Sequence, residues 1–298
     1  MCVYTYSKIG SGKTHTMTGS EGEMHEGIIP RAVRQVISSI MCMREAGWAT
    51  VVCTASIVEL YNEELRDLLV RNSQSATSSS FLSSSDAKEK LKISFNQGRV
   101  SISGLTGEEI DLSSVQSGMS QLNKLLARAT QSRTTACTGM NERSSRSHVL
   151  FMLDINGRHS DGVTVMQGGL RLVDLAGSER LDRTGTLNDA TRLKETVNIN
   201  KSLSSLSDVF LALGNKSSHV PYRNSKLTLL LQDCLSGEGK ALMLVNISPT
   251  LQSSQETLCS LRFAGQVSQV ELGRAQKQIF TAPTGTLRTA SSSVLTQY

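Results

Sequence analysis

Hydrophobic positions along the chain fall into short β-branched runs and longer stretches with apolar residues every three or four positions. The short runs predict buried strands, and the periodic stretches predict amphipathic helices. We expect strands at Met1–Tyr6, Thr50–Leu60, Val149–Ile155, Leu170–Asp174 and Lys240–Ile247. We expect helices at Gly12–Thr18, Ile28–Ala46, Ser113–Ala129, Lys194–Leu213, Leu227–Cys234 and Ser254–Val267. Strands that alternate with helices are typical of an α/β domain.

Two segments have no hydrophobic period. Residues 72–86 are rich in serine, and residues 274–298 are rich in serine and threonine. Such segments cannot bury enough apolar area to fold, so we expect a disordered insertion and a disordered tail. The remainder, residues 1–273, is predicted to form one α/β domain.

The first strand leads into a segment that nearly matches the phosphate-binding pattern G-x-x-x-x-G-K-[ST]. In that pattern backbone N–H groups cradle phosphates, the lysine reaches the β- and γ-oxygens, and the hydroxyl binds Mg²⁺. The predicted phosphate loop consists of Ser7, Lys8, Ile9, Gly10, Ser11, Gly12, Lys13 and Thr14. Ser7 replaces a glycine, at a cost of about 1 kcal/mol if the backbone needs φ > 0 there. The same letters also occur in ordinary turns.

Two later segments carry complementary chemistry. A strand ends on Asp174 and turns at Gly177, which would place a carboxylate and a backbone N–H at the ligand-binding edge of a sheet. The loop Asn141–His148 combines serine hydroxyls with Arg146, and this composition suits closure over a γ-phosphate. Each segment alone also fits an ordinary turn. In this order the three segments together predict a nucleotide switch.

Four motifs resemble those of kinesin motor domains. They are N-x-x-S-S-R-S-H at Asn141–His148, L-V-D-L-A-G-S-E-R at Leu172–Arg180, I-N-K-S-L at Ile199–Leu203 and H-V-P-Y-R-N-S-K-L-T at His219–Thr228. The resemblance covers about residues 1–273. It also implies a short helical turn at Tyr61–Leu69, which is similar to the family's Y-N-E-x-x-x-D-L-L. The N-E-R-S-S-R-S-H form and the V-E-L-G ending at Val270–Gly273 are most similar to the C-terminal-motor, minus-end-directed kinesins.

The resemblance implies a P-loop NTPase-type α/β fold, with a central, mostly parallel sheet flanked by helices. Kinesin motors carry strands before the phosphate loop that do not precede it here. We therefore expect a sheet that lacks its first strands. We also expect a chain that is a fragment, is truncated, or has a gene start placed too far downstream.

The resemblance also implies a role for each site residue, with ATP and Mg²⁺ as ligands. The catalytic residues would be Asn141, Ser145, Arg146, Gly177 and Glu179. Ser144 and the phosphate loop would bind the nucleotide, and His15 would contact its adenine ring. Thr14 and Ser145 would bind Mg²⁺ directly, and Asp174 would bind it through water. Arg146 and Glu179 would form an ion pair that closes over the γ-phosphate.

Basic and polar residues gather after the helix predicted at Lys194–Leu213. In kinesins this helix lies against the microtubule, whose acidic surface would attract clustered cations. The residues implied to bind microtubules are Lys201, Lys216, His219, Tyr222, Arg223 and Lys226. Without the resemblance, a solvated basic loop would be the better interpretation.

Composition limits the other function classes. The net charge of +5 is too small to indicate a nucleic-acid partner, and no apolar run is long enough to span a membrane. The scattered cysteines form no C-x-x-C pair, as is usual for reduced thiols in a cytosolic protein. We expect a cytoplasmic protein on the microtubule cytoskeleton, including the spindle. Because the sequence has no heptad repeat, a dimer would need a coiled coil outside this chain.

The leading hypothesis is an ATP-hydrolysing motor domain that moves on or remodels microtubules. A microtubule-binding module with impaired or no ATP turnover is the alternative, because Ser7, Lys8 and Ile9 depart from the usual loop. Lys13, Thr14, Arg146, Asp174 and Glu179 favour the active form, since a decayed site would lose some of them. A small GTPase is disfavoured because the sequence has no N-K-x-D-like guanine-reading motif.

Overall fold

The computed structural model describes residues 1–20, 25–70, 90–96, 98–135, 143–179, 190–237, 239–275 and 278–281. Its strands are β1 (Cys2–Tyr6), β2 (Trp48–Tyr61), β3 (Glu64–Asp67), β4 (Lys92–Asn96), β5 (Arg99–Ser103), β6 (Glu108–Glu109), β7 (His148–His159), β8 (Thr164–Asp174), β9 (Ala241–Val245) and β10 (Ile279–Thr281). Its α-helices are α1 (Lys13–Thr18), α2 (Ile28–Glu45), α3 (Val115–Thr135), α4 (Ala190–Gly214), α5 (Lys226–Leu230), α6 (Gln232–Leu235) and α7 (Ser254–Ser268). Short 3-10 helices are η2 (Arg143–Arg146), η3 (Tyr222–Asn224) and η4 (Leu251–Ser253).

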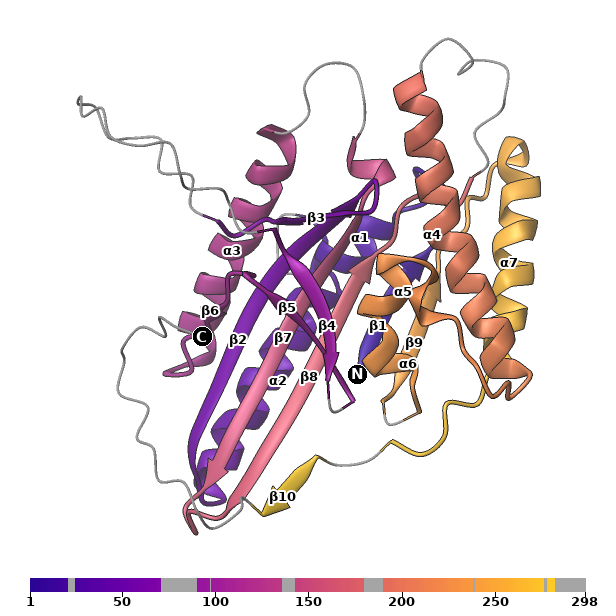
Figure 1. Ribbon diagram of the computed structural model, residues 1–298. Helices are drawn as coiled ribbons and strands as arrows, with labels where there is room; N and C mark the ends of the chain where they lie inside the picture. Colours follow the sequence, from indigo (N-terminus) through magenta and orange to yellow (C-terminus); the bar gives the residue numbers. More distant parts are fainter. Residues whose placement is uncertain are drawn as a thin grey trace, which may run out of the picture.

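A twisted central sheet runs in the order β3-β2-β7-β8-β1-β9 (Figure 1). Strand β1 pairs in parallel with both β8 and β9, whereas β2, β7 and β8 form an antiparallel series with β3 at its edge. A tight turn at 160–163 joins β7 to β8, and such a connection permits only antiparallel neighbours. The sheet is therefore mixed, and the expected parallel arrangement holds only for β8, β1 and β9.

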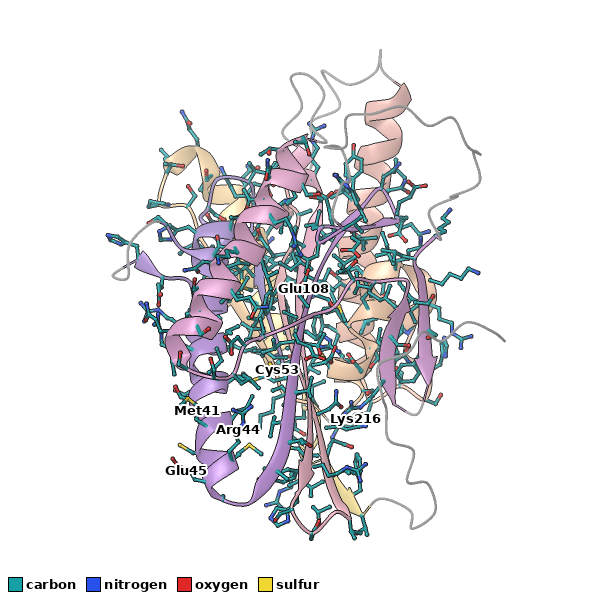
Figure 2. The ribbon with its side chains drawn as sticks, turned by 90° about the vertical axis from the view of Figure 1, so that its left-hand side faces the viewer. Met41, Arg44, Glu45, Cys53, Glu108 and Lys216 are labelled. Carbon is teal, nitrogen blue, oxygen red and sulfur yellow. The ribbon has the colours of Figure 1, made fainter. Side chains whose placement is uncertain are left out.

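Both faces of the sheet are covered, so strand residues alternate between two hydrophobic clusters. In β1, Cys2 and Tyr4 point into the cluster formed with α4 to α7 and the β4–β5 hairpin, whereas Val3 points into the cluster formed with α1, α2 and α3. Figure 2 shows α2, with Met41, Arg44 and Glu45, on the opposite side of the sheet from Lys216. Two-sided burial explains why the strands are continuous apolar runs rather than alternating patterns.

The structure corrects the expected helical turn at Tyr61–Leu69. Asn62 and Glu63 both have positive φ, at 51° and 61°, as a two-residue hairpin turn requires. Strand β3 follows this turn and pairs antiparallel with the end of β2. The turn was missed because Asn-Glu lacks the glycine that usually indicates such a hairpin.

The structure describes only a small part of the two segments predicted to be disordered. Residues 72–86 and 282–298 lie outside the described residues, so the expectation of disorder stays a prediction there. Within the expected tail, however, Ile279–Thr281 form β10, which pairs antiparallel with Met166, Val165 and Thr164 of β8. Disorder is thus wrong for these three residues, because β8 extends beyond β1 and leaves hydrogen-bonding groups open to another strand. None of the described helices has the length and apolar content needed to cross a membrane.

The packing of α3 on its neighbours generates the first prediction. A Cβ added at Gly118 would lie 2.6 Å from both the Asp111 carbonyl oxygen and Ile37 Cδ1, whereas one added at Gly265 of α7 would meet nothing within 4 Å. We expect Gly118→Ala to lower the free energy of unfolding by roughly 1–3 kcal/mol through overpacking. The control Gly265→Ala should raise it by about 0.5–1 kcal/mol. Urea unfolding checks both, and a stabilising Gly118→Ala would contradict the close approach.

Candidate functional site

The parallel pairing of β1 with β8 brings the first two predicted loops together. Thr5 is the register partner of Asp174, so both strands end at the same edge of the sheet. The Ser178 N–H donates to the Ser7 carbonyl over 3.1 Å, which joins the loop after β8 to the loop after β1. Residues separated by most of the chain thus form one edge site, where sheets of this kind bind ligands.

The phosphate loop wraps around the buried Lys13 side chain. Lys13 Nζ donates to the Ser7 and Lys8 carbonyl oxygens at 2.9 and 2.8 Å. Burial lowers the pKa of Lys13, and the nearby Asp174 and Glu179 carboxylates oppose that effect. Gly10 and Gly12 have φ values of 76° and 92°, which is a conformation that favours glycine.

Serine at position 7 is compatible with the loop backbone. The described non-glycine residues with positive φ are Asn62, Glu63 and Lys216, and Ser7 is not among them. The Ser7 side chain is buried, at 1% exposure. The cost expected for a non-glycine residue with φ > 0 therefore does not arise.

Thr14 and Asp174 form the part of the site suited to a metal ion. Thr14 Oγ1 donates to Asp174 Oδ2 over 2.5 Å, and Thr5 Oγ1 donates to Oδ1 over 3.3 Å. Carboxylate and hydroxyl oxygens are hard donors that suit Mg²⁺, which is usually bound by few protein groups together with waters and phosphate oxygens. Among the described residues no group of three or more His, Cys, Asp or Glu could hold a metal. The donor set therefore fits Mg²⁺ together with phosphate better than a site made of protein ligands alone.

Gly177 and Glu179 contact both of the other loops. The Gly177 N–H donates to the Ser145 carbonyl over 2.9 Å. Glu179 Oε2 accepts a 2.8 Å hydrogen bond from the backbone N–H of Ile9. A Cβ added at Gly177 would collide with the Glu179 carboxylate and with the Ile9 side chain. A larger residue at position 177 would therefore force the Glu179 carboxylate and the Ile9 side chain to move.

The structure describes part of the serine-arginine loop. Ser145 and Arg146 end η2, and their side chains are half-buried. Arg146 lies beside Asn62, Glu63 and Asn198. Asn141 lies outside the described residues, and the side chain of Ser144 is not described. The predicted ion pair between Arg146 and Glu179 stays a prediction.

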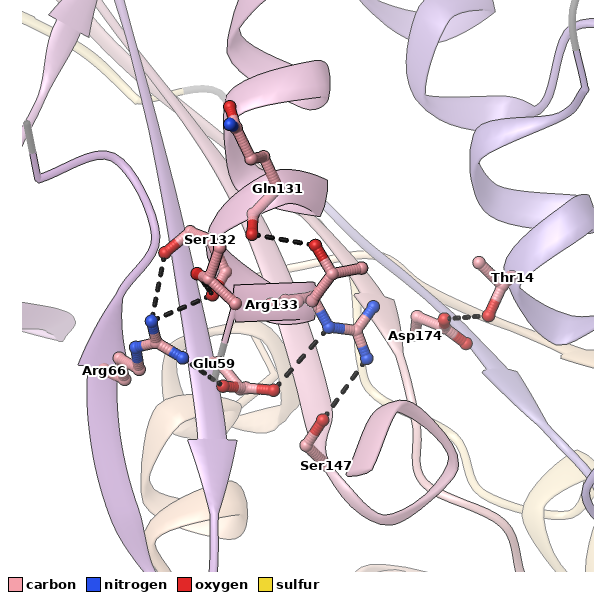
Figure 3. A network of polar contacts seen from close by, with 10 residues as sticks. Thr14, Glu59, Arg66, Gln131, Ser132, Arg133, Ser147 and Asp174 are labelled. Atoms are coloured by element: carbon pink, nitrogen blue, oxygen red, sulfur yellow. Dashed lines mark hydrogen bonds and ion pairs between the residues drawn. The ribbon is translucent and has the colours of Figure 1, made fainter. Parts of the chain in front are cut away.

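A buried charge cluster supports both ends of this loop (Figure 3). Glu59 of β2 is 1% exposed and lies 3.8 Å from Arg66 Nη1 of β3 and 3.6 Å from Arg133 Nε of α3. Arg66 also donates to the Ser132 carbonyl at 2.9 Å, and Arg133 Nη2 donates to Ser147 Oγ at 3.2 Å. Arg133 precedes the loop and Ser147 ends it, so the cluster ties the two ends together.

Sequence reasoning gave no role to His148, the last residue of the N-x-x-S-S-R-S-H motif. Its ring is 2% exposed, Nδ1 accepts from the Ala176 N–H at 3.0 Å, and Nε2 lies 2.8 Å from Ser202 Oγ. Burial, with a smaller contribution from the charge of Lys13, lowers the pKa of His148 to about 3. The ring is therefore neutral at ordinary pH. Its position at the end of the motif was the only signal in the sequence.

Two other contacts at the site were not foreseen. Lys8 Nζ donates to Ser253 Oγ over 2.6 Å, which links the phosphate loop to the start of α7. Asn246 Nδ2 donates to Thr16 Oγ1 over 2.8 Å and so holds α1 against the segment after β9. His15 is exposed on α1, and its predicted contact with an adenine ring stays a prediction.

The predicted microtubule-binding residues lie on and after α4. Lys201, Lys216, His219 and Arg223 are exposed, and Lys226 is half-buried. Tyr222 is an exception, because it is only 9% exposed and its hydroxyl donates to the Leu235 carbonyl over 3.0 Å. Burial raises its pKa to about 12. The prediction that the Tyr222 side chain is a surface contact is wrong, because its ring packs in the core.

Comparisons with known proteins identify the family that these features share. A family model described as the kinesin motor domain matches residues 1–270. The chain is 45% identical over 280 residues to "Kinesin-like protein KIN-14D" of Arabidopsis thaliana, covering 93% of this chain and 34% of that protein. It is 43% identical over 284 residues to "Kinesin-like protein KIFC1" of Homo sapiens, covering 93% of this chain and 40% of that protein.

A solved structure agrees with the sequence matches. The motor domain of the kinesin-like protein Kar3 of Saccharomyces cerevisiae is 38% identical, has a TM-score of 0.70, and is covered over 74% of its length by 90% of this chain. These relatives are C-terminal-motor kinesins, in agreement with the resemblance inferred from the motifs. This chain spans about a third of the length of the curated relatives that it matches.

The buried His148 predicts a pH-dependent stability. Unfolded His148 would take up a proton below its ordinary pKa of about 6.5, whereas the folded ring stays neutral down to about pH 3. The contribution of His148 to the free energy of unfolding is therefore fully present above pH 6.5. It is lost as the pH falls toward 3, at roughly 1 kcal/mol per pH unit.

We expect the free energy of unfolding of the wild type to fall more steeply from pH 6.5 to pH 4.5 than that of His148→Asn. Urea unfolding at several pH values measures both slopes. His15→Asn is the control for loss of a surface histidine. Equal slopes in wild type and His148→Asn would contradict a buried, neutral ring.

Proposed function

This chain belongs to the kinesin motor domain family, and from that premise we propose that it is an ATP-hydrolysing motor domain that binds microtubules. Hydrolysis would drive movement on microtubules or their remodelling. The observation that carries the proposal is the pairing of β1 with β8, which gathers Lys13, Thr14, Asp174 and Gly177 at one sheet edge. Members of the family are ATPases, and each of these residues has the chemistry that its proposed role requires.

The proposed ligands are ATP and Mg²⁺. Thr14 and Ser145 would bind Mg²⁺ directly and Asp174 through water, where the ion would neutralise charge on the phosphate oxygens. Lys13 and the amides of the phosphate loop would hold the phosphates, and His15 would lie against the adenine ring. Ser144 and Asn141 would complete the pocket. Phosphoryl transfer needs positioning and charge stabilisation more than covalent chemistry, and these residues supply both.

An exchange of partners would make the site a switch. Lys13 Nζ donates to two loop carbonyls, and the Ile9 N–H donates to Glu179. We propose that a bound γ-phosphate takes over Lys13 and the Gly177 N–H. Glu179 would then leave Ile9 to pair with Arg146 and help orient the attacking water. Because only the triphosphate reaches both loops, the closed arrangement would form with ATP and open after hydrolysis.

The microtubule-binding surface is proposed at the exposed basic residues on and after α4. Lys201, Lys216, His219 and Arg223 would face acidic tubulin, with Lys226 at the edge of the contact. Attraction between exposed charges is salt-sensitive, because ions screen it within about 10 Å at 0.1 M. Neither nucleic acid nor a membrane is a proposed partner. A dimer would form through a coiled coil outside this chain, and the proposed location is the cytoplasmic microtubule cytoskeleton, including the spindle.

The central test is steady-state ATPase activity with and without microtubules. We expect turnover that microtubules stimulate, and a loss of at least about 100-fold in Glu179→Ala, because removing a group that stabilises the transition state costs about 10²–10³ in rate. Glu45→Ala is the matched control, because Glu45 is exposed on α2, on the opposite side of the sheet from Lys216. Its activity should equal that of the wild type.

The same experiment separates the two candidate functions. Co-sedimentation with microtubules but no turnover in any of the three proteins would contradict the ATPase and support the binding module. The contact between Glu179 and the Ile9 N–H is the observation that favours this second function, because it occupies a loop donor. Equal turnover in wild type and Glu179→Ala would contradict the proposed role of Glu179.

A further prediction concerns the basic surface. We expect Arg223→Ala to weaken microtubule binding roughly two- to fivefold at low salt, as is typical for one exposed charge, and the difference should shrink at high salt. Lys124→Ala on α3 and Tyr222→Phe should bind as the wild type does, because α3 covers the other face and the Tyr222 ring is buried. Co-sedimentation at two salt concentrations measures this. If Tyr222→Phe weakened microtubule binding and Arg223→Ala did not, the proposed contact through the exposed basic residues would be contradicted.

A further inference from the structure

A chain of hydrogen bonds runs through His148 from the turn after β8 to helix α4. The Ala176 N–H donates to His148 Nδ1 over 3.0 Å, His148 Nε2 lies 2.8 Å from Ser202 Oγ, and Ser202 Oγ donates to the Ile199 carbonyl over 2.7 Å. Leu175 and Ala176 also pack in one hydrophobic cluster with Ile199 and Leu203 of α4. His148 adds to this packing a directional link, or bridge, between the turn and the helix.

The direction of each hydrogen bond follows from the network. A backbone N–H can only donate, so Nδ1 must accept and the ring proton must lie on Nε2. Nε2 therefore donates to Ser202, whose own proton goes to Ile199. Every donor in the series has one acceptor. No alternative tautomer of His148 satisfies both neighbours, so the arrangement has a single form.

Burial makes this bridge hard to break. The exposed fractions of Ala176, His148 and Ser202 are 1%, 2% and 2%. Water does not reach these groups, so no solvent molecule can replace a lost partner, and an unpaired buried donor is costly. A shift of the turn without a matching shift of α4 would leave such a donor. The less costly movement is one in which the two segments travel together.

The two ends of the bridge lie next to functional groups. Ala176 precedes Gly177, whose N–H donates to Ser145 and is the proposed sensor of the γ-phosphate. Ser202 follows Lys201, an exposed residue of the proposed microtubule-binding surface. We propose that His148 is a positioning residue that makes the Ala176–Gly177 turn and helix α4 move as one unit. Through it the nucleotide state and the contact at α4 bias each other, and the bias is reciprocal.

The inference rests on the proposed function for its two ligands, but it makes a separate claim. A buried histidine with satisfied nitrogens also fits a purely structural role. That role would change stability and leave the communication between the two surfaces intact. The test therefore needs a readout of coupling as well as one of folding.

The decisive variant is Ser202→Ala, which removes the α4 end of the bridge and keeps the His148–Ala176 contact. Ser207→Ala is the matched control, because Ser207 Oγ donates to the Leu203 carbonyl of the same helix and, among the described residues, makes no hydrogen bond with the turn after β8. In the first measurement, hydrogen exchange of α4 is compared with and without ADP and Mg²⁺. We expect nucleotide to change the exchange of α4 in wild type and Ser207→Ala, and to leave it unchanged in Ser202→Ala.

The second measurement is microtubule-stimulated ATPase. We expect the stimulated kcat of Ser202→Ala to fall about tenfold, within the usual range for coupling between sites, with unstimulated turnover within about twofold of the wild type. His148→Asn keeps an acceptor for Ala176 and cannot reach Ser202, so it should show the same loss. The double variant should lose no more than either single variant, since all three break one connection.

The outcomes separate the inference from the function on which it rests. If nucleotide changes the hydrogen exchange of α4 in the wild type but not in Ser202→Ala, the bridge through His148 is upheld, even if none of the proteins hydrolyses ATP. Nucleotide that binds the wild type without changing α4 overturns it, as does full stimulation of Ser202→Ala. In a third outcome, the losses of stimulated kcat in the two single variants add up in the double variant, and the melting temperature falls in parallel. That result would assign His148 a structural role only.

Discussion

The parallel pairing of β1 with β8 is the constraint on which the site depends. It fixes Thr5 opposite Asp174, so the phosphate loop and the D-x-x-G turn leave the sheet side by side. Every polar contact between them, from the Ser178–Ser7 hydrogen bond to the Thr14–Asp174 pair, follows from that register. A slip of one residue would turn the Asp174 side chain to the other face of the sheet and would separate Thr14 from its acceptor.

The hydrogen-bond donors of the site already have protein acceptors, which a phosphate could replace. Lys13, the Ile9 N–H and the Gly177 N–H each have a protein acceptor, so none of these donors is buried without a partner. A phosphate that binds the loop would replace these acceptors, and the carbonyls and carboxylate would have to move. The glycine at position 177 permits that close exchange because no Cβ separates the loops. Phosphate binding and loop rearrangement would therefore be one event at this edge.

Local patterns predicted most of the fold, because long apolar runs and helical periods determine strands and helices directly. The three loops were also predictable, since each carries residues whose chemistry is specific. What failed depended on tertiary context. The Asn62–Glu63 hairpin has no glycine, the ring of Tyr222 turns inward beside exposed basic neighbours, and β10 pairs with a part of β8 that β1 does not reach. His148 was overlooked because both of its partners are distant in sequence.

The cluster of Glu59, Arg66 and Arg133 has a consequence for sequence divergence. Replacing either arginine removes a cationic neighbour of the buried Glu59 carboxylate, and replacing Glu59 removes an anionic neighbour of both arginines. Breaking a fully buried ion pair typically costs about 3–5 kcal/mol, and the partial exposure of the two arginines makes the cost smaller here. Replacing a whole buried cluster with apolar residues is often neutral. Each single replacement is therefore expected to lower stability, whereas a joint replacement need not. Relatives of this sequence are expected to keep the three residues together or to exchange them together, and covariation among the three positions would show it.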